Sequence, residues 1–288
     1  MAKEIYLHIG YPKTATTTLQ NNLFPNHLEL IYLRNKDENL SFMSDVFFAR
    51  ENSFKRSINS YKNELLKKTN KSKLNKFVYS EESLTSFSMF FRFQPRPYIW
   101  TVEPNSIARK LHISFSQTGV FDTVKILVTI RRQDEMLKSM YAQVYNFVFK
   151  KFSMTNNFRK FLNYSLFENE KGGIIDSLFY NDVVMEYEKL FGKENICVLV
   201  FEELKEDSRK YIKKLCDFMN IDSASAIELI KNKHANKRSS DSGYKSDERN
   251  LIELLSYYKN IFLEVDLMDF QILKDLRCLK KSIFQERH

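Results

Sequence analysis

The distribution of apolar positions along the chain predicts an α/β protein. Four short, uninterrupted apolar runs have the character of buried strands, and they cover residues 4–9, 76–80, 125–130 and 196–200. The segments between these runs are helical in pattern, and strands that alternate with helices are typical of a mainly parallel central sheet flanked by helices. Because ligands bind at the carboxyl ends of parallel strands, we expect the functional site at that edge of the sheet.

The helical segments have recognisable ends. Residues 41–68 have a helical pattern that is interrupted near residues 50–53. A helix before the fourth strand is expected to end at Gly192, because glycine is common just after a helix C-terminus. Beyond that strand, we expect Ser208 to cap a helix that continues to Met219.

We expect residues 1–288 to form a single domain with two distinctive parts near its end. Residues 232–246 are polar, Ser-rich and basic, which predicts a flexible loop. Residues 247–288 form a C-terminal helical segment with an amphipathic pattern.

Composition narrows the class of protein. Hydrophobic residues make up 43% of the chain, which supports a sizeable core, and no run is long or apolar enough to be a membrane helix of about 20 residues. The first strand begins at once, so we expect no signal peptide. Three widely spaced cysteines fit reduced thiols and no metal pattern, so we expect a cytoplasmic protein, with attachment to the inner membrane face left open.

The net charge of +9 favours anionic partners. Much of the excess follows the lysine-rich residues 55–76, which we interpret as a solvated face. Charge alone fits a nucleic-acid-binding protein equally well, so the choice depends on motifs.

The first strand continues directly into a turn that contains one lysine and several hydroxyl side chains. Residues 9–19 read IGYPKTATTTL. The unpaired amides and the dipole of a helix N-terminus point at such a turn, which therefore binds an anion. Pro12 presets the turn and Lys13 adds a positive charge. Backbone amides and hydroxyls of the threonines are expected to hold a phosphate; these are Thr14, Thr16, Thr17 and Thr18.

This turn is not the nucleoside-triphosphate P-loop, which reads G-x-x-x-x-G-K-[ST]. The run resembles instead the 5′-phosphosulfate loop of sulfotransferases, which read roughly P-K-[ST]-G-T-T and use 3′-phosphoadenosine 5′-phosphosulfate (PAPS). Ala15 stands where that family usually has glycine. We expect a small cost if Ala15 begins the helix, and a weakened cofactor site if Ala15 must adopt a positive φ.

A second motif follows the third strand, where residues 131–143 read RRQDEMLKSMYAQ. Sulfotransferases place an arginine at the end of such a strand and a serine eight residues later, and both contact the 3′-phosphate of the cofactor. Arg131 and Ser139 have this spacing. Gln133 replaces the proline of many members, and this variant resembles a bacterial branch of the family.

A third passage, FGKENICVLVFEEL at residues 191–204, also resembles the bacterial branch, so the resemblance covers roughly residues 4–240. It implies a P-loop-like three-layer fold and in-line sulfuryl transfer from PAPS, with adenosine 3′,5′-bisphosphate as product. The implied acceptor is a hydroxyl of a carbohydrate or glycolipid. The sequence shows no metal-ligand cluster, and this chemistry requires none.

The resemblance also suggests roles for charged residues. Lys13 would stabilise charge on the bridging oxygen. Lys237 and Arg238 resemble the basic segment that closes over the 3′-phosphate, although a solvated loop explains them as well. The second strand ends at Glu81 and Glu82, and the family pattern places the general base at Glu82, with Glu81 as the neighbouring candidate. A pair of carboxylates that serve a helix dipole is the open alternative.

Two other functions remain open at this point. A P-loop kinase-like phosphotransferase would use the same fold, but the missing G-K-[ST] and the pair Arg131 and Ser139 argue against it. A non-catalytic nucleotide- or nucleic-acid-binding protein is the other alternative, and Ala15 is its best support. From the motifs we expect no nucleic-acid partner, while the oligomeric state stays open.

Overall fold

The computed structural model describes most of the first 231 residues. The described ranges are 2–34, 40–70, 72–82, 84–85, 104–145, 156–167 and 178–231. They all belong to the first of the two units into which the chain divides, Met1–Ser242. Three sequence predictions lie outside the described residues: the polar loop 232–246, its basic pair Lys237 and Arg238, and the C-terminal helical segment 247–288.

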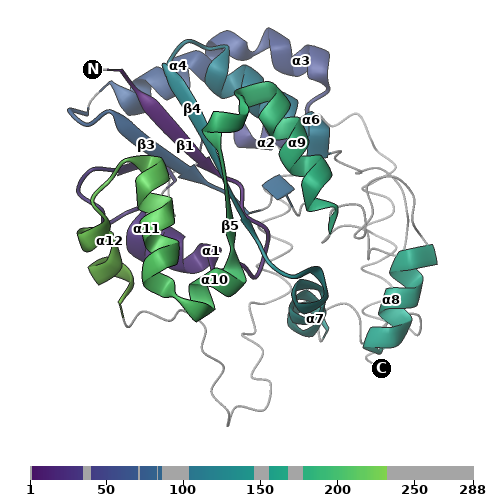
Figure 1. Ribbon diagram of the computed structural model, residues 1–288. Helices are drawn as coiled ribbons and strands as arrows, with labels where there is room; N and C mark the ends of the chain where they lie inside the picture. The colour runs from purple at the N-terminus through teal and green to yellow at the C-terminus, as the bar shows by residue number, and fades with distance from the viewer. Residues whose placement is uncertain are drawn as a thin grey trace, which may run out of the picture. The chain divides into compact units, whose positions relative to one another are not determined.

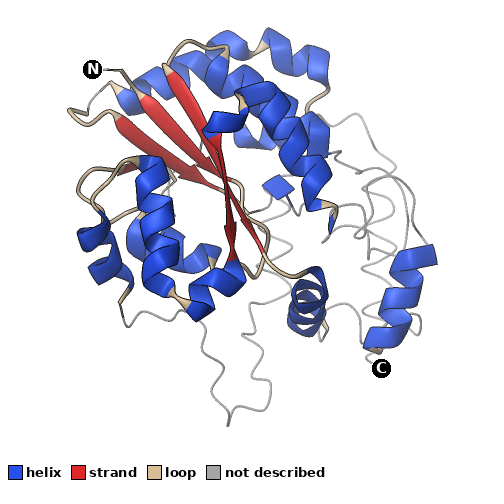
Figure 2. Ribbon diagram, in the orientation of Figure 1, coloured by secondary structure: helices blue, strands red, loops and turns tan. Residues whose placement is uncertain are grey.

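A five-stranded parallel sheet forms the centre of the unit (Figures 1 and 2). Its strand order is β2-β3-β1-β4-β5, and the strands are β1 (Glu4–His8), β2 (Ile31–Tyr32), β3 (Lys76–Ser80), β4 (Thr123–Ile130) and β5 (Ile196–Val200). The predicted α/β class with a mainly parallel sheet is confirmed. The short edge strand β2 was not predicted, because two residues are too few to show a period.

Helices connect the strands. Before β3 they are α1 (Thr16–Thr18), the π-helical turn η1 (Leu19–Leu23), α2 (Met43–Phe48), α3 (Glu51–Arg56) and α4 (Ile58–Thr69). Between β3 and β5 they are α6 (Pro104–Leu111), η2 (His112–Ser116), α7 (Gln133–Val144), α8 (Phe158–Phe167), α9 (Tyr180–Phe191) and η5 (Lys193–Asn195). After β5 they are α10 (Phe201–Glu206), α11 (Ser208–Met219) and α12 (Ser223–Ile230). The helical pattern is interrupted at residues 49–50, between α2 and α3, at the start of the predicted interruption; residues 51–53 already belong to α3. Helix α9 ends at Phe191 and Gly192 follows it, as expected.

Each face of the sheet carries its own apolar core. In β1, Ile5 and Leu7 pack in one core, whereas Tyr6 between them packs in the other. The first core joins the sheet to α2, α4, α6, α7 and α9, and the second joins it to η1, α11 and α12. Figure 1 shows these two groups of helices on opposite sides of the sheet. Burial on both faces explains why the strands are continuous apolar runs in the sequence.

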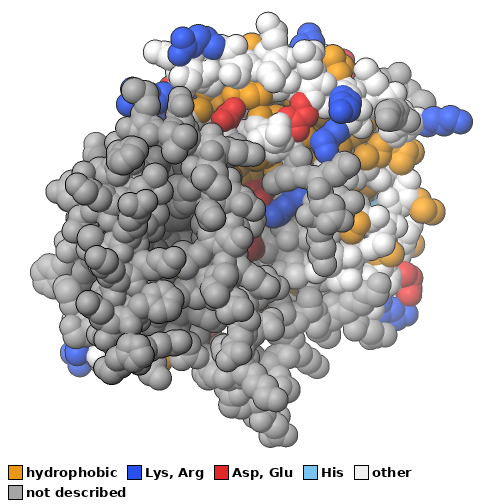
Figure 3. Space-filling view, turned by 180° about the vertical axis from the view of Figure 1, so that it is seen from behind, with side chains coloured by type: hydrophobic (Ala, Val, Ile, Leu, Met, Phe, Trp, Pro, Cys, Tyr) orange, Lys and Arg blue, Asp and Glu red, His pale blue; other side chains and the backbone are white. Residues whose placement is uncertain are grey.

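Charges of both signs share the surface. In the described part of the face in Figure 3, side chains of Lys and Arg and of Asp and Glu are all exposed. Glu51, for example, pairs with Lys55 at 2.8 Å and with Arg109 at 3.8 Å. Lys62, Lys67 and other lysines of residues 55–76 are exposed, in agreement with their interpretation as a solvated face.

The cap of α11 differs from the prediction. The side chain of Asp207, rather than Ser208, accepts a hydrogen bond from the amide of Lys210 at 3.0 Å. Asp207 has extended backbone angles and Ser208 is already helical. Aspartate and serine are both good N-caps, so the pattern alone could not choose between neighbours.

We predict that Asp207→Ala lowers the free energy of unfolding by roughly 0.5–2 kcal/mol, because an amide of the first turn loses its acceptor. Thermal or urea unfolding measures this effect. The matched control is Ser208→Ala, which we expect to change stability by less than about 0.5 kcal/mol. A larger loss from the control than from Asp207→Ala would contradict the assignment of the cap.

Candidate functional site

The turn between β1 and α1 has a backbone shape that suits an anion. Lys13 and Ala15 both have left-handed angles, with φ of 66° and 65°, while Thr14 between them does not. Backbone amides in such an alternating turn point to a common side and form an anion-binding concavity. Helix α1 begins at Thr16, so Ala15 is its N-cap and not its first helical residue. The turn therefore combines a concave row of amides with a helix N-terminus.

The hydroxyl of Thr14 points into the protein. It donates to the carbonyl of Tyr11 at 2.5 Å and lies 2.7 Å from the hydroxyl of Thr129 in β4, and its side chain is fully buried. The sequence analysis expected this hydroxyl to hold a phosphate. Since the hydroxyl is engaged inside the protein, the backbone amide is the group through which Thr14 would contact an anion.

Gly10 makes room for this arrangement. A Cβ atom at this position would lie 1.9 Å from the Thr129 hydroxyl and 2.9 Å from Nε2 of His8. Such distances are far below van der Waals contact, so the chain needs glycine here for close approach of the turn to β4. The sequence alone could not assign this role to Gly10, because Thr129 and His8 are far from each other along the chain.

Arg131 brings the second motif to the first. Its Nη1 donates to the carbonyl of Lys13 at 3.3 Å, and its guanidinium lies 4.9 Å from the ring centre of Phe201. Glu135, one helical turn later, approaches Nη2 at 3.6 Å. The side chain is only 12% exposed, and its buried Nε has no hydrogen-bond partner in the described part of the chain. Arg131 is thus a nearly buried cation at the edge of the turn formed by residues 12–15, the lysine turn.

Ser139 occupies the expected place in sequence, two turns into α7, and is half-buried. Among the described residues its hydroxyl makes no hydrogen bond to Arg131. The structure therefore places Arg131 against the lysine turn, and Ser139 two turns into α7 without a hydrogen bond to Arg131.

The two candidate carboxylates contact different neighbours. Glu81 is buried and pairs with Arg34 at 3.0 Å. Glu82 accepts a hydrogen bond from the hydroxyl of Thr16 at 2.7 Å, and Thr16 is the first residue of α1. Glu82 is therefore the carboxylate in contact with the helix that follows the lysine turn. Pro12 and Thr18 are buried in the same turn and helix, and Thr17 is half-buried.

Residues that follow β5 complete this edge, and none of them is among the site residues predicted from the sequence. Glu202 accepts a hydrogen bond from the amide of Arg132 at 3.2 Å, and its second carboxylate oxygen is buried without a partner in the described residues. Tyr180 donates to the carbonyl of Arg131 at 2.7 Å, and burial raises the pKa of this phenol. The rule that parallel strands end together predicts that residues after β5 lie near Arg131.

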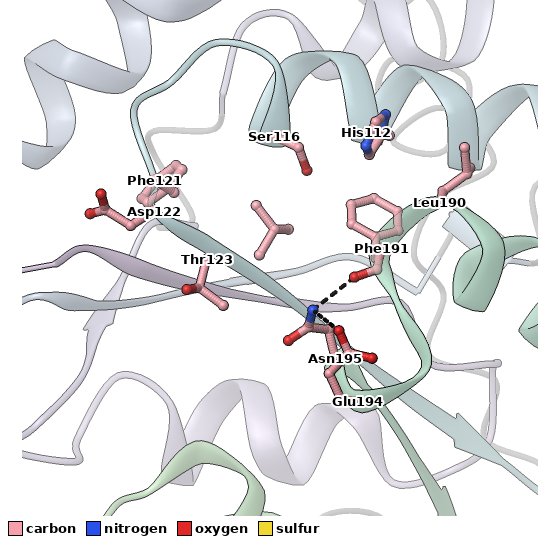
Figure 4. A pocket seen from close by; sticks show the side chains of 10 residues that line it. His112, Ser116, Phe121, Asp122, Thr123, Leu190, Phe191, Glu194 and Asn195 are labelled. Carbon is pink, nitrogen blue, oxygen red and sulfur yellow. Dashed lines mark hydrogen bonds between the residues drawn. The ribbon is translucent and has the colours of Figure 1, made fainter.

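A pocket of about 430 Å³ lies at the other end of the sheet (Figure 4). It is lined by Thr123 and Val124 at the start of β4 and by Asn195 just before β5. Asn195 donates to the carbonyl of Phe191 at 2.8 Å, as the dashed line shows. Since the lysine turn follows the opposite end of the strands, this pocket is separate from the candidate site.

The sequence matches the model of the sulfotransferase domain family over residues 6–251. This match covers most of the chain, so the chain belongs to the sulfotransferase family, and the predicted class of protein is confirmed. No curated protein sequence matches the chain.

Solved structures of similar fold include a sulfotransferase from Alicyclobacillus acidocaldarius, with 14% identity, 91% of this chain and 93% of that chain covered, and a TM-score of 0.49. The mouse sulfotransferase SULT7A1, solved in complex with PAP, has 14% identity, coverage of 97% and 88%, and a TM-score of 0.42. The sulfotransferase domain of the Synechococcus PCC 7002 olefin synthase has 16% identity, coverage of 85% and 82%, and a TM-score of 0.42.

Two kinds of feature are absent from the described residues. They contain no group of three or more His, Cys, Asp or Glu side chains that could hold a metal ion. None of their helices combines the length and the apolar character that crossing a bilayer requires.

We predict that Ala15→Gly raises the free energy of unfolding by about 1 kcal/mol, because the left-handed conformation costs alanine about 1–2 kcal/mol and glycine almost nothing. The concave turn should be retained, so nucleotide affinity should stay equal or rise. Urea unfolding and calorimetry measure the two effects. Ala49→Gly is the matched control, because Ala49 has an ordinary φ of −69° and should lose stability. A loss of stability in both variants would contradict the strain at Ala15.

Proposed function

We propose that the protein transfers a sulfuryl group from PAPS to a hydroxyl of a carbohydrate or glycolipid acceptor. The observation that carries the proposal is the contact of Arg131 with the Lys13 carbonyl, because it unites two anion-binding motifs at one edge of the sheet. When bound, PAPS supplies an activated sulfuryl group and leaves as adenosine 3′,5′-bisphosphate.

The residues of the turn fit this cofactor. Amides of the concave turn and of the start of α1 would hold the 5′-phosphate; the turn and helix comprise Pro12, Lys13, Thr14, Ala15, Thr16, Thr17 and Thr18. The ammonium of Lys13 would stabilise negative charge that develops on the bridging oxygen, in the way that positioned cations assist phosphoryl transfer.

The 3′-phosphate would be held by Arg131 and Ser139. A buried donor without a partner costs roughly 1–3 kcal/mol, and an anionic oxygen is the partner that the Nε–H of Arg131 would gain. Lys237 and Arg238 would add positive charge from the polar loop. In this proposal, the Lys13 ammonium and the Arg131 guanidinium flank the concave row of amides.

Glu82 is the proposed general base, and its Thr16 hydrogen bond supports the choice over Glu81. This hydrogen bond holds the Glu82 carboxylate beside the helix that follows the lysine turn, where a base could accept the acceptor's hydroxyl proton. Glu81 pairs instead with Arg34 and is buried at the edge of the sheet near β2.

The acceptor class and the cellular location are proposed from the sequence. The carbohydrate or glycolipid acceptor follows from the resemblance to the bacterial branch, and a cytoplasmic location, with peripheral attachment to the inner membrane face left open, follows from the composition. We propose no nucleic-acid partner, because the motifs of residues 9–19 and 131–143 resemble those of an enzyme that binds a nucleotide cofactor.

Calorimetric titration with adenosine 3′,5′-bisphosphate, ADP and ATP with magnesium tests the cofactor. We expect micromolar affinity for the bisphosphate and a loss of most of this affinity when the 3′-phosphate is removed. Preference for ATP with magnesium would instead favour the kinase-like alternative. Absence of binding to all three would contradict a functional nucleotide site.

We predict that Glu82→Gln lowers the rate of transfer by about 10²–10⁴-fold, because the amide cannot accept a proton. Bisphosphate affinity should stay within a few-fold of the parent. The comparison variant is Glu81→Gln, which removes the ion pair with Arg34; it should lower the melting temperature while turnover stays within a few-fold of the parent. The opposite pattern, with turnover lost in Glu81→Gln and kept in Glu82→Gln, would move the base to Glu81.

A further inference from the structure

A continuous chain of buried polar groups lies beneath the lysine turn. Its links are Gln20 Nε2 to Ser80 Oγ (2.9 Å), Ser80 Oγ to His8 Nδ1 (2.7 Å), His8 Nε2 to Thr129 Oγ1 (3.3 Å), Thr129 Oγ1 to Thr14 Oγ1 (2.7 Å) and Thr14 Oγ1 to the Tyr11 carbonyl (2.5 Å). The four residues from Ser80 to Thr14 are at most 1% exposed. This series of hydrogen bonds thus joins η1, β3, β1 and β4 to the turn.

The direction of each hydrogen bond follows from the last acceptor in this series, the Tyr11 carbonyl. The Tyr11 carbonyl can only accept, so Thr14 donates its single hydroxyl proton there. Thr14 must then accept from Thr129, which in turn has no proton left for His8. The His8 ring must therefore donate from Nε2 to Thr129.

The other half of the chain follows from the charge state of the imidazole. Burial lowers the pKa of His8 to about 3, so the ring is neutral and its Nδ1 carries no proton. Ser80 therefore donates to Nδ1 and accepts from the amide of Gln20. The hydroxyl of Tyr32 also lies beside Ser80, and it can donate to the remaining lone pair without changing this order.

We propose that His8, fixed as the Nε2–H tautomer, is a positioning residue that sets the shape of the anion-binding turn through Thr129 and Thr14. This inference rests on the proposed function, in which the turn holds the 5′-phosphate of the cofactor. Two left-handed residues in one short turn are costly, and the hydrogen bond from Thr14 to Tyr11 spans the start of that turn. Glycine is required at position 10 for this arrangement, because a side chain there would come between His8 and Thr129.

The spectroscopic test uses the wild-type protein. Nitrogen-15 NMR of the imidazoles should show His8 with a protonated Nε2 and an unprotonated Nδ1, unchanged between pH 5 and pH 8. A protonated Nδ1, or a titration in this range, would overturn the inference. This measurement needs no ligand and no variant, so it decides the hydrogen-bond order even if the proposed function fails.

The functional test uses substitutions in β4. Thr129→Val removes the link to Thr14 with little change in volume, and we expect bisphosphate affinity to fall at least about 10-fold, because the binding-competent turn becomes a minor state. Thr129→Ser keeps the hydroxyl and should restore most of the affinity. The matched control is Thr123→Val on the same strand at its opposite end, which should bind like the wild type.

Substitutions of His8 distinguish a role in hydrogen bonding from a role in packing alone. His8→Gln can accept from Ser80 and donate to Thr129, whereas His8→Leu can do neither. We expect His8→Gln to bind the bisphosphate more tightly than His8→Leu. In both variants the fold-increase in KM for PAPS should exceed the fold-decrease in kcat. Equal affinity in wild type, Thr129→Val and His8→Leu would overturn the inference. If the wild type itself does not bind the bisphosphate, the proposed function is overturned instead.

Discussion

Pairing of β1 with β4 beyond the end of β1 is the interaction on which the site depends. The regular strand ends at His8, yet the amide of Ile9 still donates to Leu127 at 2.9 Å and the amide of Tyr11 to Thr129 at 2.8 Å. This extension carries the chain along β4 up to the first residue before the lysine turn. The turn therefore begins from a fixed strand. Arg131, two residues after Thr129, is close enough to donate to the Lys13 carbonyl in this turn.

The same constraint explains the unusual backbone of the turn. A chain held against β4 up to Tyr11 must enter α1 at Thr16 within four intervening residues, and two of these, Lys13 and Ala15, are left-handed. Such strain persists only where the surroundings determine the conformation, and functional sites are where it is commonly found. The strain and the concave row of amides are two consequences of one short connection.

Much of the fold could be predicted from the sequence because burial on both faces makes the strands of this sheet continuous apolar runs. The two-residue strand β2 could not be, and the cap at Asp207 could not be separated from Ser208. In the site, the motifs placed Lys13 and Arg131 at one edge. They could not show that Thr14 points inward or that Thr129 anchors the turn, because such contacts join residues far apart in sequence.

The adjacent carboxylates show how tertiary structure resolves what a motif leaves open. Glu81 still follows the sheet, since its amide donates to the His8 carbonyl at 2.9 Å, and its side chain reaches Arg34, which follows β2. Glu82 is the first residue free of that pairing geometry, and its side chain contacts Thr16 instead. Neighbouring residues at a strand end point to different sides, so one carboxylate pairs at the sheet edge while the next contacts the helix that follows the lysine turn. The division of roles between them therefore comes from where β3 stops pairing with β1.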